Sequence, residues 1–328
     1  MGRRKIMGVK IGYFAVTDAF TPTECLRQAV EAERMGFDAL WVEDHLIAMP
    51  GGTECNFAWT VMSSALQATD RVPFYTGVTA PIMRYHPAVV AQAFATMGAM
   101  YPGRVGIGVG TGEPPNEMAV YGGEWPSNNT RLEMLEEALT IMNLLWISDE
   151  PVSFAGKYYT LNNAVLLTKP EEKVPVYVSA IGPRAANLAG RLGDHLISLA
   201  NNPLYIKEEL LPALEAGARE SGKDPNTMER VGHFTYVYDP DQVVRTENLQ
   251  HDAGTISGGA MSKAFSSEFI KIFHSAEDVI KKIEEMERMG YTHIAVGDAN
   301  MAIAKGPRLS PDAAASFKVW EDVLPHVR

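Results

Sequence analysis

Several features that define large classes of proteins are missing from this chain of 328 residues. It contains no run of about 18 consecutive apolar residues, so no transmembrane helix is predicted. Its first residues, MGRRKIMGVKIGYF, are basic but lack the apolar core of about 7 to 15 residues that a signal peptide needs. We therefore expect a soluble, cytoplasmic protein without a membrane partner.

Cysteine and positive charge are both scarce. The two cysteines, Cys25 and Cys55, are too few for a disulfide framework or a four-thiolate zinc site. Lysine and arginine number 29 against 40 aspartates and glutamates, which gives a formal net charge of −11. Such a surface repels phosphate backbones, so no nucleic-acid partner is expected. The remaining composition is that of an ordinary globular protein, with 46% hydrophobic residues available for a large core.

Short apolar runs alternate with longer amphipathic stretches along the chain. Eight runs are predicted as strands: Val9–Phe14, Ala39–Val42, Phe74–Thr79, Val105–Val109, Val174–Ser179, His195–Leu199, Phe234–Tyr238 and Ile294–Val296. Helical patterns lie between most of them, over Pro87–Met100, Arg131–Leu145, Arg184–Leu192, Leu204–Ser221 and Ser275–Met289. This alternation predicts an α/β fold, a (β/α)8 TIM barrel formed by residues 1–328 as a single domain. Periodicity alone leaves an open doubly wound sheet as the alternative.

A helix with recognisable ends is predicted after the first strand. Thr21 is a suitable N-cap, and Pro22 occupies the first helical position, where its missing N–H costs nothing. Gly36 is suited to a left-handed C-terminal cap. The helical period places three side chains toward the core, those of Leu26, Ala29 and Val30.

One short sequence occurs in similar form near both ends of the chain. ERMGF over residues 33–37 matches ERMGY over residues 287–291, and each is followed by an apolar strand that closes on an acidic residue, Asp44 or Asp298. In a closed barrel the first and last βα units are neighbours. The similarity therefore supports a barrel, with chance likeness as the alternative.

Two stretches interrupt the alternation. Ser148–Leu161 has the pattern of a small hairpin. Asp239–Phe269 is polar and rich in glycine and serine, which indicates an insertion after the seventh strand. Because loops that follow barrel strands form the active-site face, this insertion is a candidate lid over the substrate.

The run GIGVGTGE over residues 106–113 offers two interpretations. It does not contain G-x-G-x-x-G, and no lysine follows as in a P-loop. Glycine at alternate strand positions instead removes the side chains from one face, which permits close approach of another backbone or of a flat ligand. The tail Thr-Gly-Glu-Pro-Pro-Asn at the end of the strand favours a ligand.

Glu43-Asp44-His45 follows the second strand, at the end where barrel enzymes place their catalytic groups. Histidine is the usual general acid or base, and a neighbouring carboxylate can set its tautomer. In the barrel Glu113 would lie opposite, although a strand-end histidine is often structural. Arg84 and His86 are explained by the start of a helix. The other histidines lack metal-ligand spacing, so no metal is predicted.

Several segments together resemble a known family. They are IGYFA, WVEDH, TGVTAPIMRYHPAVVAQAFATMGAMYPGRVGIGVGTGEPPNE and KVPVYVSAIGP. They are similar to the luciferase-like superfamily of barrels, and within it to the branch that uses the deazaflavin coenzyme F420, with its secondary-alcohol and glucose-6-phosphate dehydrogenases. The resemblance covers residues 9 to 240 and resumes near residue 275. It implies a (β/α)8 barrel, a homodimer, and reversible hydride transfer between a substrate carbon and C5 of the deazaflavin.

The resemblance also implies roles for individual residues. His45 matches the histidine beside C5 and the substrate oxygen, Glu113 matches its partner acid, and Asp18 stands where relatives have a glutamate. Gly77-Val78 matches a non-prolyl cis peptide that supports the bent deazaflavin. The remaining matches are cofactor contacts: Asp44, Thr111, Gly112, Asn116, Ser179, Ala180, Ile181 and Gly182.

Two departures from the family pattern concern the substrate. Met49 lies near the place of an active-site tryptophan, and Asn201-Asn202-Pro203 stands where the sugar-phosphate enzymes have a lysine. Without that cation glucose 6-phosphate fits poorly, so we expect an alcohol/carbonyl pair as the small-molecule substrate. The alternatives are an F420-dependent methylene-tetrahydromethanopterin reductase, an FMN-dependent luciferase-like monooxygenase, and a barrel without enzymatic activity.

Overall fold

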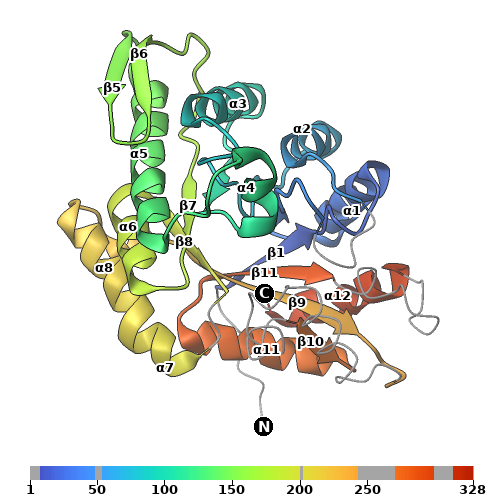
Figure 1. The fold of residues 1–328 in the computed structure, drawn as a ribbon. Coiled ribbons are helices and arrows are strands. Elements are labelled where there is room, and N and C mark those ends of the chain that lie inside the picture. Colours follow the sequence, from blue (N-terminus) through green and yellow to red (C-terminus); the bar gives the residue numbers. More distant parts are fainter. Residues whose placement is uncertain (1–7, 49–53, 200–201, 243–269, 299–312, 328) are drawn as a thin grey trace. The chain divides into compact units, whose positions relative to one another are not determined.

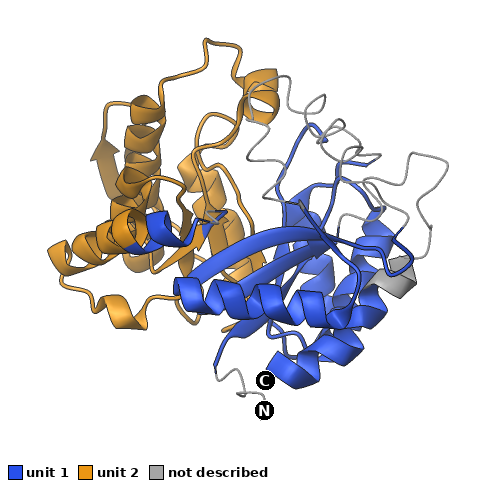
Figure 2. Cartoon of the chain, turned by 90° about the horizontal axis from the view of Figure 1, so that it is seen from below, with its two compact units in different colours: residues 1–72, 198–207, 230–328 blue, residues 73–197, 208–229 orange. Residues whose placement is uncertain are grey.

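All eight predicted strands occur in the structure, a computed structural model (Figure 1). It describes residues 8–48, 54–199, 202–242, 270–298 and 313–327. In these residues no helix combines the length and apolar character that crossing a membrane requires. The chain divides into two compact units, which are coloured blue and orange in Figure 2.

The first unit contains residues 1–72, 198–207 and 230–328. Its parallel sheet has the order β2-β1-β11-β9-β10. The strands are β1 (Lys10–Ala15), β2 (Ala39–Val42), β9 (Arg230–Tyr238), β10 (Ile270–Phe273) and β11 (His293–Asp298). The helices are α1 (Pro22–Met35), α2 (Ala58–Ala68), α7 (Pro203–Tyr205), α11 (Ala276–Met289) and α12 (Ala313–Val327).

The two similar βα units adjoin in this sheet, because β1 pairs in parallel with β11. Their helices α1 and α11 end in the same way. Gly36 and Gly290 have left-handed φ angles of 96° and 104°, a conformation that glycine adopts without strain. The residues that follow them, Phe37 and Tyr291, each donate a backbone hydrogen bond back into the last helical turn. The likeness between the two ends of the chain is therefore structural.

The capping of α1 is confirmed, and of the three side chains predicted to face the core, Ala29 is buried. The Thr21 side chain accepts the Glu24 N–H. Val30, however, is 41% exposed and Leu26 is only half-buried. The buried face consists of Cys25, Gln28, Ala29 and Ala32. The polar Gln28 made this buried face hard to predict from the sequence. Its side-chain oxygen accepts a hydrogen bond from the Tyr13 hydroxyl, which is distant in the chain.

Aromatic rings fill the interface between the first unit's sheet and α12. Phe317 lies 4.6 Å from the Tyr13 ring, and Trp320 lies 5.3 Å from Phe37, measured between ring centroids. The Trp320 indole N–H donates to the Tyr236 hydroxyl at 2.9 Å. Because its one polar group is satisfied in this way, the indole can be fully buried.

The second unit contains residues 73–197 and 208–229. Its strands β4 (Ile107–Val109), β7 (Val176–Ser179) and β8 (His195–Ser198) pair in parallel in that order. Strand β3 (Phe74–Thr76) meets the β4 segment through the bridges Phe74–Val105 and Thr79–Val109. The helices are α3 (Pro87–Met100), α4 (Pro114–Tyr121), α5 (Asn128–Ile147), α6 (Pro183–Leu192) and α8 (Leu211–Glu220).

The predicted helix over residues 204–221 is in fact divided. It consists of α7, a π-helical turn over Ile206–Leu210, and α8. Pro212 lies in the first turn of α8 and has no N–H to continue the α-helical ladder, which explains the break. A short 3-10 helix over Pro225–Thr227 follows α8.

The predicted hairpin is confirmed as β5 (Val152–Ala155) and β6 (Thr160–Ala164), which pair antiparallel. The Glu137 carboxylate on α5 fixes its turn by accepting three consecutive backbone N–H groups, those of Lys157, Tyr158 and Tyr159. Two other predictions concern residues that the structure does not describe. They are the insertion at 239–269, of which only residues 239–242 are described, and Met49.

The alternating glycines serve close packing within the second unit. A Cβ atom on Gly106 would lie 2.5 Å from the Tyr75 ring, and one on Gly108 would lie 2.0 Å from the Thr76 carbonyl oxygen. A Cβ atom on Gly110 would meet the Val78 side chain at 2.7 Å. The glycine run was predicted to permit close approach of either another backbone or a flat ligand. At Gly108 it is the backbone of Thr76 that approaches closely. The neighbouring Gly77–Val78 peptide bond is cis, as the family resemblance implies.

Candidate active site

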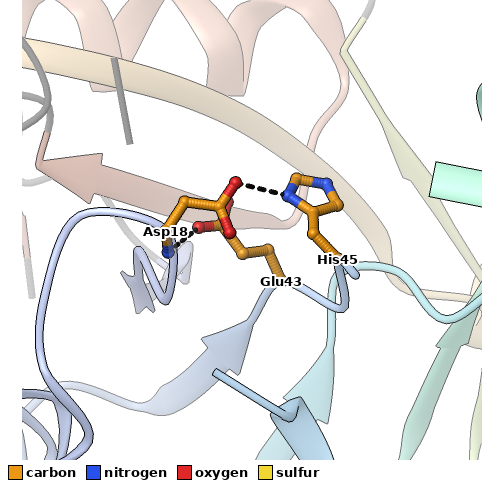
Figure 3. Close-up of side chains that lie close together, drawn as sticks. All are labelled: Asp18, Glu43 and His45. Atoms are coloured by element: carbon orange, nitrogen blue, oxygen red, sulfur yellow. Dashed lines mark hydrogen bonds and ion pairs between the residues drawn. The ribbon is translucent and has the colours of Figure 1, made fainter. Parts of the chain in front are cut away.

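Asp18 and His45 form a hydrogen-bonded pair in the first unit (Figure 3). Asp18 follows β1 and His45 follows β2, two strands that pair in parallel, so both residues lie beyond the carboxyl ends of adjacent strands. The Asp18 Oδ2 to His45 Nδ1 distance is 2.8 Å. The Asp18 side chain is 3% exposed and that of His45 is 20% exposed. A shielded carboxylate thus contacts an imidazole that remains accessible.

This contact decides which ring nitrogen carries the proton in neutral His45. When the Asp18 carboxylate is ionised it can only accept hydrogen bonds, and Nδ1 is then the donor. The lone pair of the neutral ring is then on Nε2, which lies on the side of the ring away from Asp18 in Figure 3. The pair has the composition of a general base held by an orienting acid.

The loop that carries Asp18 is held by residues that the sequence patterns did not indicate. Glu43 Oε1 accepts the Asp18 N–H at 3.0 Å, and the Thr17 hydroxyl donates to the Glu43 carbonyl oxygen at 3.2 Å. The Asn56 amide donates to the carbonyl oxygens of Thr17 and Phe20 at 3.0 and 2.7 Å. A carboxylate two residues before the histidine was the available signal for Glu43, but nothing local pointed to Asn56.

Ligand-type atoms of Asp18, Glu43 and His45 all lie within 4.8 Å of one another. Two carboxylates and an imidazole at this spacing are compatible with a cation. This cluster was not visible in the sequence, because Asp18 comes from a different loop and the three residues have no ligand spacing along the chain. Asp44, which lies between Glu43 and His45 in the sequence and is a predicted cofactor contact, is buried.

Glu113 and Asn116 lie together in the second unit, at the beginning of α4. Asn116 Nδ2 donates to Glu113 Oε1 at 2.6 Å. The Glu113 N–H donates to Glu117 Oε2, also at 2.6 Å. Gly112 precedes them with a left-handed φ of 69°, and a Cβ there would also lie 2.7 Å from Glu117 Oε2. The TGEPPNE motif therefore folds into one compact turn that fixes the Glu113 carboxylate.

A buried ion pair supports this turn. Arg84 Nε lies 3.6 Å from Glu117 Oε1, and the two side chains are only 6% and 2% exposed. The start of a helix therefore explains Arg84 only in part, because Arg84 also forms an ion pair with Glu117. The pairing was hidden in the sequence because Arg84 lies in the loop after β3, whereas Glu117 lies on α4.

The predicted cofactor turn from Ser179 to Gly182 joins β7 to α6. Ala180 is buried, and its N–H donates to the Ile197 carbonyl oxygen at 2.9 Å. Ile181 is 53% exposed, and a Cβ on Gly182 would meet nothing within 4 Å. Among the described residues, no atom therefore lies close to a Cβ at the start of α6, and the apolar Ile181 side chain lies beside it.

The sequence pattern of luciferase-like monooxygenases matches residues 9–306. The chain belongs to this luciferase-like family. Within it, the F420-dependent glucose-6-phosphate dehydrogenase of Mycolicibacterium gilvum (strain PYR-GCK) is 37% identical over 303 residues, covering 90% of this chain and 87% of that one. The enzyme of the same name from Amycolatopsis mediterranei (strain U-32) is 35% identical over 340 residues, covering 98% and 99%.

Solved structures agree with the luciferase-like assignment. An F420-dependent secondary alcohol dehydrogenase, in complex with an F420-acetone adduct, is 40% identical and has a TM-score of 0.87. The match covers 98% of this chain and all of that one. A coenzyme F420-dependent tetrahydromethanopterin reductase from Methanopyrus kandleri shares the fold, with a TM-score of 0.75 at 22% identity. The predicted (β/α)8 barrel is thereby confirmed, and the open doubly wound sheet is excluded.

Other histidines of this luciferase-like chain have structural contacts. His233 is buried and stacks on Phe14 with ring centroids 4.2 Å apart, and burial lowers its pKa to about 3. His195 Nδ1 accepts the Glu229 N–H, and His293 Nε2 accepts the Trp41 indole N–H. A buried histidine of such low pKa remains neutral at physiological pH, so His233 is part of the core.

Proposed function

We propose that this protein is a coenzyme F420-dependent oxidoreductase that transfers a hydride between C5 of the deazaflavin and an alcohol/carbonyl substrate. The observation that carries the proposal is the Asp18–His45 pair beyond the ends of β1 and β2. Near full-length relatives at 35 to 40% identity, named as F420-dependent dehydrogenases, support the choice of cofactor.

The residues present fit such a cofactor in two respects. The acid–base pair can move a proton but contains no group that carries a hydride, so the chemistry requires a hydride carrier. The beginning of α6 presents backbone N–H groups beside open space at Gly182, which suits an anionic group of an elongated cofactor. When bound, the deazaflavin supplies the site that accepts or returns the hydride at C5.

The chain's own residues would then handle the proton. As the alcohol C–H hydride leaves, the hydroxyl proton passes to His45 Nε2, and a carbon–oxygen double bond forms. Asp18 holds the ring by Nδ1 and stabilises the resulting imidazolium. In carbonyl reduction the same proton returns from Nε2 to the substrate oxygen.

For the cofactor we propose the contacts that the family pattern indicates. They are Asp44, Gly77, Val78, Thr111, Gly112, Asn116, Ser179, Ala180, Ile181 and Gly182. Glu113 is proposed as a second catalytic acid. Asp44 belongs to the first unit and the others to the second. The cis peptide defines the backbone at Gly77 and Val78, and the TGEPPNE turn defines it at Gly112 and Asn116.

An alcohol or ketone is the proposed substrate class, in preference to a sugar phosphate. The Asn202 side chain accepts the N–H groups of Leu204 and Tyr205 as the N-cap of α7. It is a neutral amide engaged in capping, so it offers no positive charge to a phosphate. The family resemblance further supports a cytoplasmic homodimer, an assembly that light scattering on the purified protein would test.

Cofactor preference is the first experimental test. We expect the purified protein to bind F420 at least tenfold more tightly than FMN, and to show no measurable affinity for NADP. Equilibrium titration by fluorescence quenching measures all three affinities. Tighter binding of FMN would instead place the protein among the flavin-dependent monooxygenases of the family.

Replacing Glu113 with glutamine tests its proposed role in proton transfer. Glutamine preserves the shape and can still accept the Asn116 hydrogen bond, while removing the ionisable carboxyl. We expect turnover to fall by about 10- to 100-fold with an altered pH–rate profile. Steady-state rates from pH 5 to 9 at saturating F420 provide the measurement. Wild-type rates across that range would assign the Glu113 side chain a structural function only, as the acceptor of the Asn116 hydrogen bond.

A further inference from the structure

Glu43 joins the loops that carry the acid–base pair. Three hydrogen bonds connect residues 17–18 with residues 43–45, and Glu43 takes part in two of them. Figure 3 shows the bond from the Asp18 N–H to Glu43 and the Asp18–His45 bond. Its carboxylate accepts the Asp18 N–H, and its carbonyl oxygen accepts the Thr17 hydroxyl. The third contact is the Asp18–His45 bond itself. The same short segment after β2 therefore supplies both the imidazole and the group that holds its partner.

We propose that Glu43 is a positioning residue whose side-chain oxygen fixes the Asp18 backbone, so that the Asp18 carboxylate meets His45 Nδ1. The catalytic consequence of this arrangement rests on the hydride-transfer function proposed above. The geometric consequence, the choice of tautomer in His45, is independent of that function.

Three polar groups of Asp18 are engaged: its backbone N–H, its backbone carbonyl oxygen and Oδ2 of its side chain. Its N–H donates to Glu43 Oε1 at 3.0 Å, its carbonyl oxygen accepts the Glu54 N–H at 3.1 Å, and its side chain bonds to His45 at 2.8 Å. With both backbone groups engaged, only the two side-chain torsions of Asp18 remain to aim the carboxylate. Removing the Glu43 acceptor would release the N–H, which belongs to a buried residue and must find another acceptor.

Asn56 does not provide the same constraint. It donates to the carbonyl oxygens of Thr17 and Phe20, on either side of Asp18, and so holds the ends of the turn. The Thr17 carbonyl and the Asp18 N–H belong to the same peptide plane. Asn56 donates to the carbonyl oxygen of this plane, and Glu43 accepts its N–H. Glu43 is therefore the side chain that fixes the N–H of the residue contacting His45.

The experiment compares Glu43→Gln with Glu43→Ala. Glutamine keeps an oxygen that can accept the Asp18 N–H, whereas alanine removes the acceptor. The full-length chain is labelled with 15N-histidine, and the His45 resonances are assigned by their loss in His45→Gln. Long-range proton–nitrogen spectra then report which ring nitrogen is protonated in the neutral form. Glu54→Ala is the matched control, because it removes a nearby carboxylate and keeps the backbone bond to Asp18.

We expect wild type, Glu43→Gln and Glu54→Ala to show the Nδ1-protonated tautomer, and Glu43→Ala to show a mixture of both tautomers. A wild-type spectrum for Glu43→Ala would overturn the proposal. A mixture in Glu43→Gln equal to that in Glu43→Ala would also overturn it, because the negative charge rather than the accepting oxygen would then decide the tautomer. Circular dichroism establishes that each variant is folded.

Turnover with F420 tests the catalytic consequence. Glu43→Ala should lower kcat about 10- to 100-fold with KM changed less than about threefold, while Glu43→Gln stays within about threefold of wild type. In an Asp18→Ala background, Glu43→Ala should cost less than about twofold, since it acts through Asp18. If Glu43→Ala lowered kcat by the same factor in the Asp18→Ala background as in wild type, it would not act through Asp18. Absence of F420-linked turnover in wild type would reject the proposed function, while the spectra would still decide the role of Glu43.

Discussion

Replacing His45 with alanine should reduce kcat by about 10²- to 10⁴-fold, the usual contribution of a general acid or base. His45 is the half-buried member of the Asp18–His45 pair and presents Nε2 away from the carboxylate. Without the imidazole, the substrate proton would have to pass to water, which is neither positioned nor oriented by Asp18. Affinity for F420 should change little, because the variant removes a proton acceptor rather than a cofactor contact.

Stopped-flow reduction of F420 by a series of secondary alcohols measures this effect at the chemical step. His326→Ala is a suitable control, since His326 is exposed near the end of α12. It should retain wild-type rates. If His45→Ala keeps more than about a tenth of wild-type activity, His45 has a packing role and the proposed base must be another group.

Replacing Gly108 with alanine should destabilise the protein by about 1 to 3 kcal/mol or more, as overpacking in a tight core does. The added Cβ would lie 2.0 Å from the Thr76 carbonyl oxygen and 3.0 Å from Val78 Cγ1. Thr76 cannot yield easily, because its hydroxyl also donates to the Gly108 carbonyl oxygen at 2.9 Å. The β3 and β4 segments would have to separate, with loss of the contacts that join them.

Urea unfolding followed by circular dichroism gives the free-energy difference. Gly182→Ala provides the comparison for stability, since a Cβ at that position meets nothing within 4 Å and the backbone φ is −115°. It should unfold within about 0.5 kcal/mol of wild type, as substitutions without new contacts usually do. An equally stable Gly108→Ala variant would show that the two segments can move apart at little cost.

The sequence by itself determined the elements whose signals are local. The first helix could be located from Thr21, Pro22 and Gly36, because an N-cap, a proline in the first turn and a left-handed glycine act within a few residues. The repeated ERMG segment predicted two similar βα units, and β1 pairs with β11 as a barrel requires. The family resemblance, carried by long contiguous motifs, predicted the fold and the cofactor class.

Element boundaries were less accurate where tertiary contacts override the local pattern. Strand β9 begins at Arg230, four residues before its apolar run, and includes Gly232. A Cβ on Gly232 would lie 2.5 Å from the Met286 side chain and 2.8 Å from the Tyr291 ring. A glycine that weakens the strand pattern in the sequence is thus required by the packing of α11 and of the residues that follow it, which lie more than 50 positions further along the chain.

Only the tertiary structure decided how the candidate site is held. His45 and Asp18 were visible as residues at strand ends, but their 2.8 Å contact depends on the parallel register of β1 and β2. The supporting contacts of Glu43 with the Asp18 N–H, and of Arg84 with Glu117, likewise join residues that are 25 and 33 positions apart in the chain. Hydrogen bonds act over about 3 Å, so the groups that position a catalytic side chain are selected by proximity in space, whereas composition and periodicity record only proximity along the chain.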